Sequence, residues 1–250
     1  MPSTSETGHA KNVANFEDLI SFCTAYGAAY NPSKESLTLI KLKELETAAK
    51  QTLQQVKTNK TGFDNATNAR QTAFKDVKPL ATKIVNALAV SGASTLSLDD
   101  AKTINRKIQG TKANGAAKTA NAPINPNAPV VSDKTISTSQ QSYDSIIDHF
   151  TKIIETVSQE SNYKPNETEL KTVTLQAKLN NLKATNTALI NGYTNWGNAR
   201  ISRNATLYNA LTGLVQTALD VKKYVKSVFG ATSPQFKQVS GLEFTNVKDR

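Results

Sequence analysis

The chain has 250 residues and a formal net charge of +10 at neutral pH, and only 38 % of its residues are hydrophobic and 6 % aromatic. Its one cysteine, Cys23, excludes an intramolecular disulfide and an all-cysteine metal site, and no apolar run approaches the roughly 18 residues of a membrane-spanning helix. We therefore expect a soluble helical protein with thin apolar seams, long polar faces and a buried free thiol.

The N-terminus lacks both the basic and the apolar region of a secretory signal. The cytoplasm is the default location, with unconventional export as the alternative. Basic residues are spread through the whole chain, which favours solubility and weak attraction to polyanions over a dedicated nucleic-acid groove.

The first part of the chain predicts a short helix followed by a long one. Residues 1–14 are polar and predicted to be loose, and apolar side chains from Phe16 to Tyr26 recur at helical spacing. A proline and small polar residues after Tyr30 mark the start of a long helix. We expect that helix to end at the turn-like stretch 58–68.

A third helix is predicted from Phe74 to Ser91, and Pro79 should kink it because proline has no N–H to donate. Ser97 then caps a short basic helix that runs to about Ile108. Residues 109–140 contain three prolines and no helical periodicity, which is typical of a flexible linker.

The second half repeats this order. The tyrosine and proline of the segment that begins at Tyr163 match those that follow Tyr30, and residues 143–147 resemble residues 16–20. The long helix has a leucine seam from Leu175 to Leu189, and two glycines, at 192 and 197, should form the next turn. The last helix has the clearest heptad seam, formed by Leu207, Leu211, Leu214, Ala218, Val221, Val225 and Val228.

We therefore predict an all-α protein made by tandem duplication. Residues 1–108 form the first copy, 109–140 the linker and 141–250 the second copy, each copy being a short helix plus a hairpin of two long helices. Two hairpins with one apolar face each would pack as an antiparallel four-helix bundle with pseudo-twofold symmetry. Two tethered modules, each with its own core, are the alternative.

Three short segments carry a resemblance to a known family. They are Gly8-His9-Ala10-Lys11-Asn12 with the four residues after it, Phe229-Gly230-Ala231, and Ser233-Pro234-Gln235-Phe236-Lys237-Gln238-Val239 with the tail that follows. In these segments the chain resembles a family of uncharacterised bacterial helical proteins with two copies. The resemblance implies a bacterial origin and carries over no activity or site.

Signatures of catalysis or ligand binding are missing from the sequence. His9 and His149 have no second histidine one turn away, so both are interpreted as surface or helix-capping residues, and neither a P-loop nor an ExxH motif occurs. No metal, cofactor or small-molecule site is predicted. Trp196, the only tryptophan, is expected to plug the end of a bundle, with an exposed ligand platform as the alternative.

The repeated arginines Arg70 and Arg200 are the most informative polar feature, because each is predicted to open a helix, where a cation opposes the helix dipole. They are interpreted as ties to carbonyls or to a carboxylate across the turn, and alternatively as paired anion sites. Six residues are the candidate anion or partner contacts: Arg70, Arg200, Arg203, Lys222, Lys223 and Lys226.

Repetition without a catalytic site favours a non-enzymatic scaffold that binds a protein partner or other copies of itself. The alternative is a basic protein that binds the phosphate backbone of nucleic acid non-specifically, using Lys222, Lys223 and Lys226 with Lys83, Arg106 and Lys107. The absence of aromatics interleaved with these cations argues against single-strand recognition. An enzyme has no nameable nucleophile and base, and a membrane-active bundle would need wider apolar faces.

Overall fold

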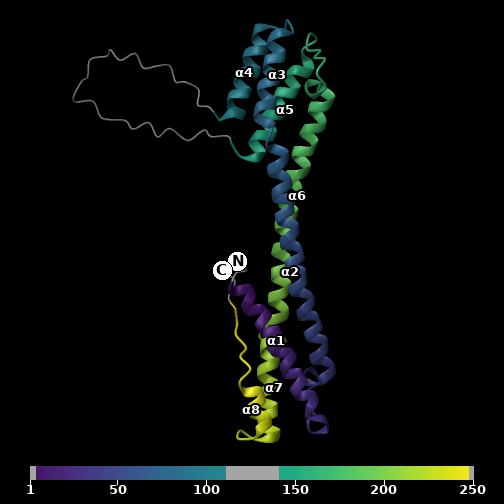
Figure 1. The fold of residues 1–250 in the computed structure, drawn as a ribbon, viewed down its shortest axis with the longest axis vertical. Helices are drawn as coiled ribbons and strands as arrows, with labels where there is room; N and C mark the ends of the chain where they lie inside the picture. The colour runs from purple at the N-terminus through teal and green to yellow at the C-terminus, as the bar shows by residue number, and fades with distance from the viewer. Residues whose placement is uncertain (1–3, 111–140, 248–250) are drawn as a thin grey trace, which may run out of the picture. The chain divides into compact units, whose positions relative to one another are not determined.

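The computed structural model describes residues 4–110 and 141–247. Throughout these two ranges the regular elements are helices (Figure 1), which confirms the prediction of an all-α protein. Nearly all of the predicted linker, from residue 111 to residue 140, lies outside the described residues.

The chain forms two compact units, and each combines both halves of the sequence. Unit 1 consists of Met1–Asp64 and Asn191–Arg250, and unit 2 consists of Asn65–Ile190. The compact units therefore do not coincide with residues 1–108 and 141–250. The assignment of these two ranges as repeated copies stays a prediction.

Unit 1 is built around the first helix of the chain. It contains α1 (Thr4–Ala25), the start of α2 (Leu39–Phe74), the end of α6 (Thr172–Tyr208), α7 (Leu214–Phe229) and α8 (Pro234–Ser240), with short 3₁₀ turns at Gly27–Ala29 and Glu35–Leu37. Helix α1 packs against α7 and α8. The fully buried side chains of this core include Phe16 and Leu19 from α1 and Val221 and Val225 from α7.

Unit 2 is built around the first helix after the linker. It contains the end of α2, α3 (Val77–Val90), α4 (Thr95–Gln109), α5 (Tyr143–Gln159), a 3₁₀ turn at Thr168–Leu170 and the start of α6. Helix α5 packs against α3 and α4. Phe150 and Ile153 from α5 meet Ile84 and Leu88 from α3 in this core. Each core therefore contains side chains from both halves of the chain. In the predicted alternative of two tethered modules, each half would have a core of its own.

The predicted turns inside the two hairpins are wrong. Helix α2 runs without a break through residues 58–68, and α6 runs through both glycines at 192 and 197. Asparagine and threonine side chains in this part of α2 bond the carbonyl four residues earlier, as Asn59 does to Gln55 (2.8 Å). Lys60 pairs with Asp64 one turn away. These local bonds satisfy polar groups within the helix, so weak helix formers do not end it.

The predicted helix from Leu207 to Phe229 is broken where its heptad seam is continuous. Helix α6 ends at Tyr208 and α7 begins at Leu214, and Leu211 in the turn is 82 % exposed. The side-chain oxygen of Asn209 accepts from the N–H groups of Leu211 (2.9 Å) and Thr212 (3.1 Å), which holds the turn. Gly213 fits there because a Cβ would lie 2.5 Å from the Asn209 nitrogen.

Pro79 does not kink a helix. Helix α3 begins at Val77, which places Pro79 in the first turn, where the missing N–H has no intrahelical partner to lose. The next helix, α4, is confirmed, although its cap is Ser94 and not Ser97: the Ser94 hydroxyl accepts from the N–H of Ser97 (3.0 Å).

The N-terminal residues are helical and not loose, because α1 begins at Thr4. His9 is fully buried in this helix, against the prediction of a surface or capping residue. The predicted buried thiol is confirmed, since Cys23 is buried and its burial raises the pKa to about 12.

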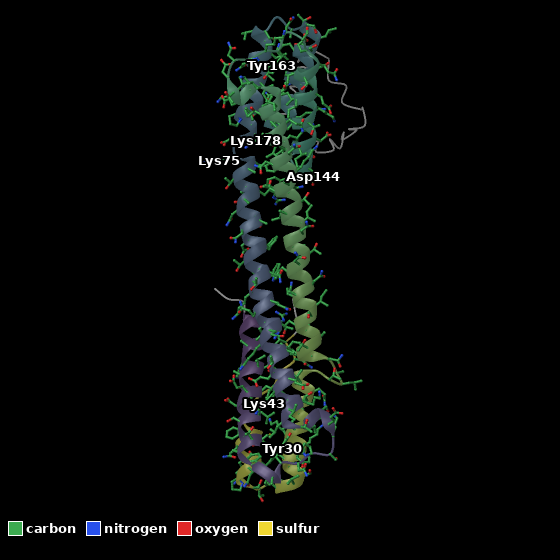
Figure 2. All side chains as sticks on the ribbon, turned by 90° about the vertical axis from the view of Figure 1, so that its right-hand side faces the viewer. Tyr30, Lys43, Lys75, Asp144, Tyr163 and Lys178 are labelled. Atoms are coloured by element: carbon green, nitrogen blue, oxygen red, sulfur yellow. The ribbon has the colours of Figure 1, made fainter. Side chains whose placement is uncertain are left out.

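The repeated Tyr-x-Pro segments fold in the same way. The Tyr30 hydroxyl donates to the carbonyl of Leu37 (2.7 Å), and the Tyr163 hydroxyl donates to the carbonyl of Leu170 (3.0 Å); both tyrosines are labelled in Figure 2. Burial raises the pKa of Tyr163 to about 12. Each tyrosine ties the chain to the 3₁₀ turn that precedes a long helix.

The first helix of each half has buried apolar side chains with the same spacing. The fully buried Phe16 and Leu19 of α1 correspond to the fully buried Phe150 and Ile153 of α5, 134 residues later. Residues 143–147, whose sequence resembles residues 16–20, begin seven residues before Phe150. A shift of seven is nearly two helical turns and keeps every side chain on almost the same face, so periodicity alone does not detect it.

The turn between α6 and α7 generates the first prediction. Gly213→Ala should lower the free energy of unfolding by about 2 kcal/mol, because the new methyl group overlaps the backbone of Asn209. The matched control is Gly62→Ala inside α2, where a Cβ meets no described atom within 4 Å, and which should stabilise by about 1 kcal/mol. Urea unfolding followed by circular dichroism measures both, and equal effects would contradict the assigned geometry.

Candidate interaction site

Aromatic rings from α2 and α6 meet on unit 1. The ring of Phe63 stacks on Trp196 with 5.6 Å between centroids and 16° between planes. Tyr193 lies edge-on to Trp196 at 6.4 Å and tilted against Phe63 at 5.8 Å. Three large apolar side chains thus gather on helices that are otherwise polar here.

Two cations flank these rings. The Lys60 ammonium lies 5.5 Å from the Trp196 ring centroid and is also paired with Asp64 at 2.6 Å. The Arg200 guanidinium carbon lies 5.3 Å from the same ring. Both distances are within the range of favourable cation–π interaction. We call Lys60, Phe63, Tyr193, Trp196 and Arg200 the aromatic–cationic cluster.

The cluster is partly open to solvent. Tyr193 is 62 % exposed, while Phe63, Trp196 and Arg200 are half-buried. Tryptophan, tyrosine and arginine are the side chains that most often dominate the energy of protein interfaces, because they offer large area and a polar group together. The cluster can therefore serve as a binding surface as well as a tie between α2 and α6.

Trp196 lies inside α6 and does not close the end of a bundle. The contact between Trp196 and Phe63 was not predicted from the sequence, because a turn was expected at residues 58–68. A residue in a turn belongs to no helical face, so Phe63 was not expected to face another helix. One observation could have found the pair. Trp196 lies 133 residues after Phe63, and 133 is also the separation of the two repeated tyrosines, Tyr30 and Tyr163.

Arg70 belongs to unit 2 and has structural partners there. Its guanidinium carbon lies 3.8 Å from the Tyr143 ring centroid, and its Nη1 donates to Asn186 (3.1 Å). The Asn186 amide nitrogen in turn donates to Asp144 (2.8 Å). Arg70 lies in the interior of α2 and does not open a helix, so it does not oppose a helix dipole.

The predicted pairing of Arg70 with Arg200 does not follow the register of the long helices. The residue 133 positions after Arg70 is Arg203, which is fully buried and donates to Asn204 from Nε (3.1 Å) and Nη2 (2.8 Å). Arg200 belongs to the aromatic–cationic cluster. Of the three predicted arginines, only Arg200 belongs to this partly exposed cluster.

The three lysines near the end of α7 have internal partners. Lys222 donates to the carbonyls of Ser240 (3.0 Å) and Leu242 (2.7 Å), and burial lowers its pKa. Lys223 lies 3.6 Å from Asp220, and Lys226 lies over the ring of Phe236. Lys222 is therefore a structural anchor, and the exposed pair Lys223 and Lys226 contributes only modest positive charge.

The other predicted phosphate contacts, Lys83, Arg106 and Lys107, lie in unit 2, and the side chains of the first two have partners. Lys83 pairs with Glu169 (2.8 Å), and Arg106 donates to the hydroxyl of Thr103 (2.8 Å). Unit 1 and unit 2 thus each contain part of the predicted set of cations.

His149 is buried, against the prediction of a surface or capping residue. It is 3 % exposed, and neither ring nitrogen has a hydrogen-bond partner among the described residues, although Nδ1 lies 3.9 Å from Asp148. Burial lowers the pKa of His149, so the neutral ring is favoured.

Within residues 4–110 and 141–247, no group of three His, Cys, Asp or Glu side chains is placed to hold a metal ion. The helices described in these ranges are too short or too polar to cross a membrane. Comparisons with protein-family models, curated proteins and solved structures found no match. The resemblance of the terminal segments to a bacterial family therefore stays a prediction.

The arginines give a test of structural against binding roles. Arg70→Gln should lower the free energy of unfolding by about 1–2 kcal/mol, because it removes the stack on Tyr143 and a charged donor to Asn186. Arg200→Gln, which removes one partly exposed cation–π contact, should cost about 0.5–1 kcal/mol. Chemical denaturation of both variants measures the difference, and a larger loss for Arg200→Gln would reverse the assignment.

His149 predicts a dependence of stability on pH. Because its folded pKa is lowered, the unfolded chain binds more protons as pH falls through the ordinary histidine value of about 6.5, and stability is lost in that window. His149→Leu should be more stable than the parent by about 1 kcal/mol at pH 8, since it removes a buried unpaired polar ring. This advantage should increase at acidic pH, and an advantage equal at both pH values would contradict the burial of a neutral histidine.

Proposed function

We propose that this protein is a non-enzymatic interaction protein, a helical scaffold that binds a protein partner or a second copy of itself. The observation that carries the proposal is the aromatic–cationic cluster, in which Tyr193 remains exposed and two cations flank the neighbouring ring of Trp196. Aromatic and arginine side chains on a rigid helical pair are well suited to bury against another protein.

We also infer that the two halves are copies related by pseudo-twofold symmetry. In a twofold repeat, the residue on the axis meets its own equivalent, and Phe63 stacks on Trp196 at the equivalent position. The matching bonds of Tyr30 and Tyr163 support the same relation. Unit 1 combines α1 of the first half with α7 and α8 of the second, and unit 2 combines α5 of the second half with α3 and α4 of the first. On this interpretation the two copies exchange helices, in place of two hairpins that pack as a four-helix bundle.

Binding of single-stranded nucleic acid is the second candidate. The sequence offered no aromatics interleaved with cations, whereas in the aromatic–cationic cluster Lys60 and Arg200 flank the ring of Trp196, which lies edge-on to the exposed Tyr193. Exposed aromatic rings with cations nearby are the arrangement on which a base stacks while its phosphate is neutralised. The net charge of +10 acts in the same direction.

Tyr193→Ala tests the proposal. The variant should weaken self-association, or binding of a defined protein partner, by about tenfold or more, because an exposed tyrosine at the centre of an interface is a typical energetic anchor. Sedimentation velocity over a wide range of protein concentration measures self-association. The matched control is Val173→Ala, which removes an equally exposed apolar side chain, 73 % accessible, outside the cluster.

The same variants separate the two candidates. Loss of salt-dependent oligonucleotide binding in Tyr193→Ala, measured by fluorescence anisotropy while self-association is unchanged, would favour nucleic acid over a protein partner. If the parent neither self-associates nor binds a partner or an oligonucleotide, the proposed function is rejected.

A further inference from the structure

The parts of the chain before and after the predicted linker meet in unit 1 as two subunits would. We call residues 1–110 the first half and residues 141–250 the second half. Helix α1 of the first half lies beside α7 and α8 of the second (Figure 1). Phe16 and Leu19 from α1 share a core with Val221 and Val225 from α7, and all four are 0 % exposed. Without the second half, the apolar face of α1 would be open to water.

The two halves meet again in unit 2, with their roles reversed. Here α5 of the second half packs against α3 and α4 of the first. Phe150 and Ile153 from α5 share a core with Ile84 and Leu88 from α3, and all four are fully buried. Each half therefore supplies one helix whose burial depends on the other half.

Polar contacts also join the halves in both units. In unit 1 the Asn12 side chain donates to the carbonyl of Thr245 (2.7 Å) and accepts from its N–H (3.1 Å). In unit 2 Lys83 pairs with Glu169 (2.8 Å). Because hydrogen bonds have a preferred direction and charges a sign, such contacts select one register between apolar faces that alone accept many partners.

Each long helix contributes to both cores. Helix α2 of the first half places Leu42 in the core of unit 1 and Phe74 in the core of unit 2. Helix α6 of the second half places Leu175 in the core of unit 2 and Leu207 in the core of unit 1. The halves therefore hold each other at two sites that a continuous helix connects. When one site opens, the other keeps the partner at a high effective concentration, so both sites together bind more tightly than either alone.

We propose that the two halves are complementary binding partners, and that the covalent connection through residues 111–140 is not needed to hold them together. The partner that fits the first half is a polypeptide with the sequence of the second half. Separation of the halves exposes both cores to water at once. Cutting the connection removes only the tether that keeps the halves at a high effective concentration.

The aromatic–cationic cluster is itself completed by both halves. Lys60 and Phe63 come from the first half, and Tyr193, Trp196 and Arg200 from the second. A chain that is cut between the halves should therefore keep the surface on which the proposed function rests. Assembly of the halves depends on the two cores and not on this cluster, so it is measured without any external partner and fails separately from the proposed function.

A full-length chain with a specific protease site inserted after Asn121 tests the proposal. After complete cleavage both halves are still present in the sample, and we expect them to sediment together in a one-to-one ratio at about 1 μM, with the helical circular dichroism of the uncut chain. The urea midpoint of the cut chain should rise more steeply with protein concentration than that of the uncut chain, because only the cut halves separate when they unfold. Halves that sediment separately at about 1 μM would overturn the proposal.

Core variants of the cut chain show whether the two sites hold the halves together. Leu19→Ala in α1 and Ile153→Ala in α5 each truncate a fully buried side chain that packs against the opposite half. Each should weaken association of the halves by about 30-fold or more, and the effects should multiply in the double variant because the two cores share no residue.

The matched control is Ile201→Ala, which truncates a side chain that is 69 % exposed and should leave the association unchanged. Equal effects of the buried and the exposed substitutions would mean that the halves stay together by non-specific collapse, and would also overturn the proposal.

Discussion

Each hydrophobic core is closed by helices from opposite halves of the chain. Helix α1 packs against α7 and α8 in unit 1, and α5 packs against α3 and α4 in unit 2. An isolated amphipathic helix of this length does not bury its apolar stripe and is marginal in water. The first helix of each half therefore depends for its burial on helices from the end of the other half.

The long helices explain why the aromatic–cationic cluster has its present position. The fully buried side chains of α2 in unit 1, such as Leu42 and Ala49, lie toward its start, and those of α6 in unit 2, such as Leu175 and Leu182, lie toward its start as well. Farther along, both helices become polar, and Phe63 with Trp196 supplies the apolar contact between them in unit 1. A contact made by large aromatics on thin helices leaves part of each ring uncovered, as the exposure of Tyr193 shows.

The segments near the two ends of the chain form a second system with its own physical basis. Asn12 and Asn15 form hydrogen bonds with backbone groups of an extended segment that pairs with no strand among the described residues. Gly8 and Val247 then fit by shape. The same residues carried the resemblance to a bacterial family in the sequence, and the structure gives them a shared role that periodicity did not indicate.

Predictions from the sequence were accurate where the local pattern has one physical meaning. The helical class, the repeated Tyr-x-Pro turns and the buried Cys23 follow from composition and spacing. They were wrong where two arrangements share one pattern. A heptad seam ran through the turn at Gly213, weak helix formers at 58–68 continued α2, and two histidines in polar surroundings, His9 and His149, were buried.

The sequence by itself determined that the chain is helical and where most helices carry apolar faces, because these properties arise from residues three and four positions apart. Which helix covers which face was decided by the tertiary structure, because a heptad seam accepts any partner of similar width and a shift of seven residues leaves its face unchanged. The contacts between segments far apart in the sequence were also decided by the tertiary structure. Phe63 and Trp196 are 133 residues apart, Asn12 and Thr245 are 233 apart, and only packing of distant segments brings such pairs together.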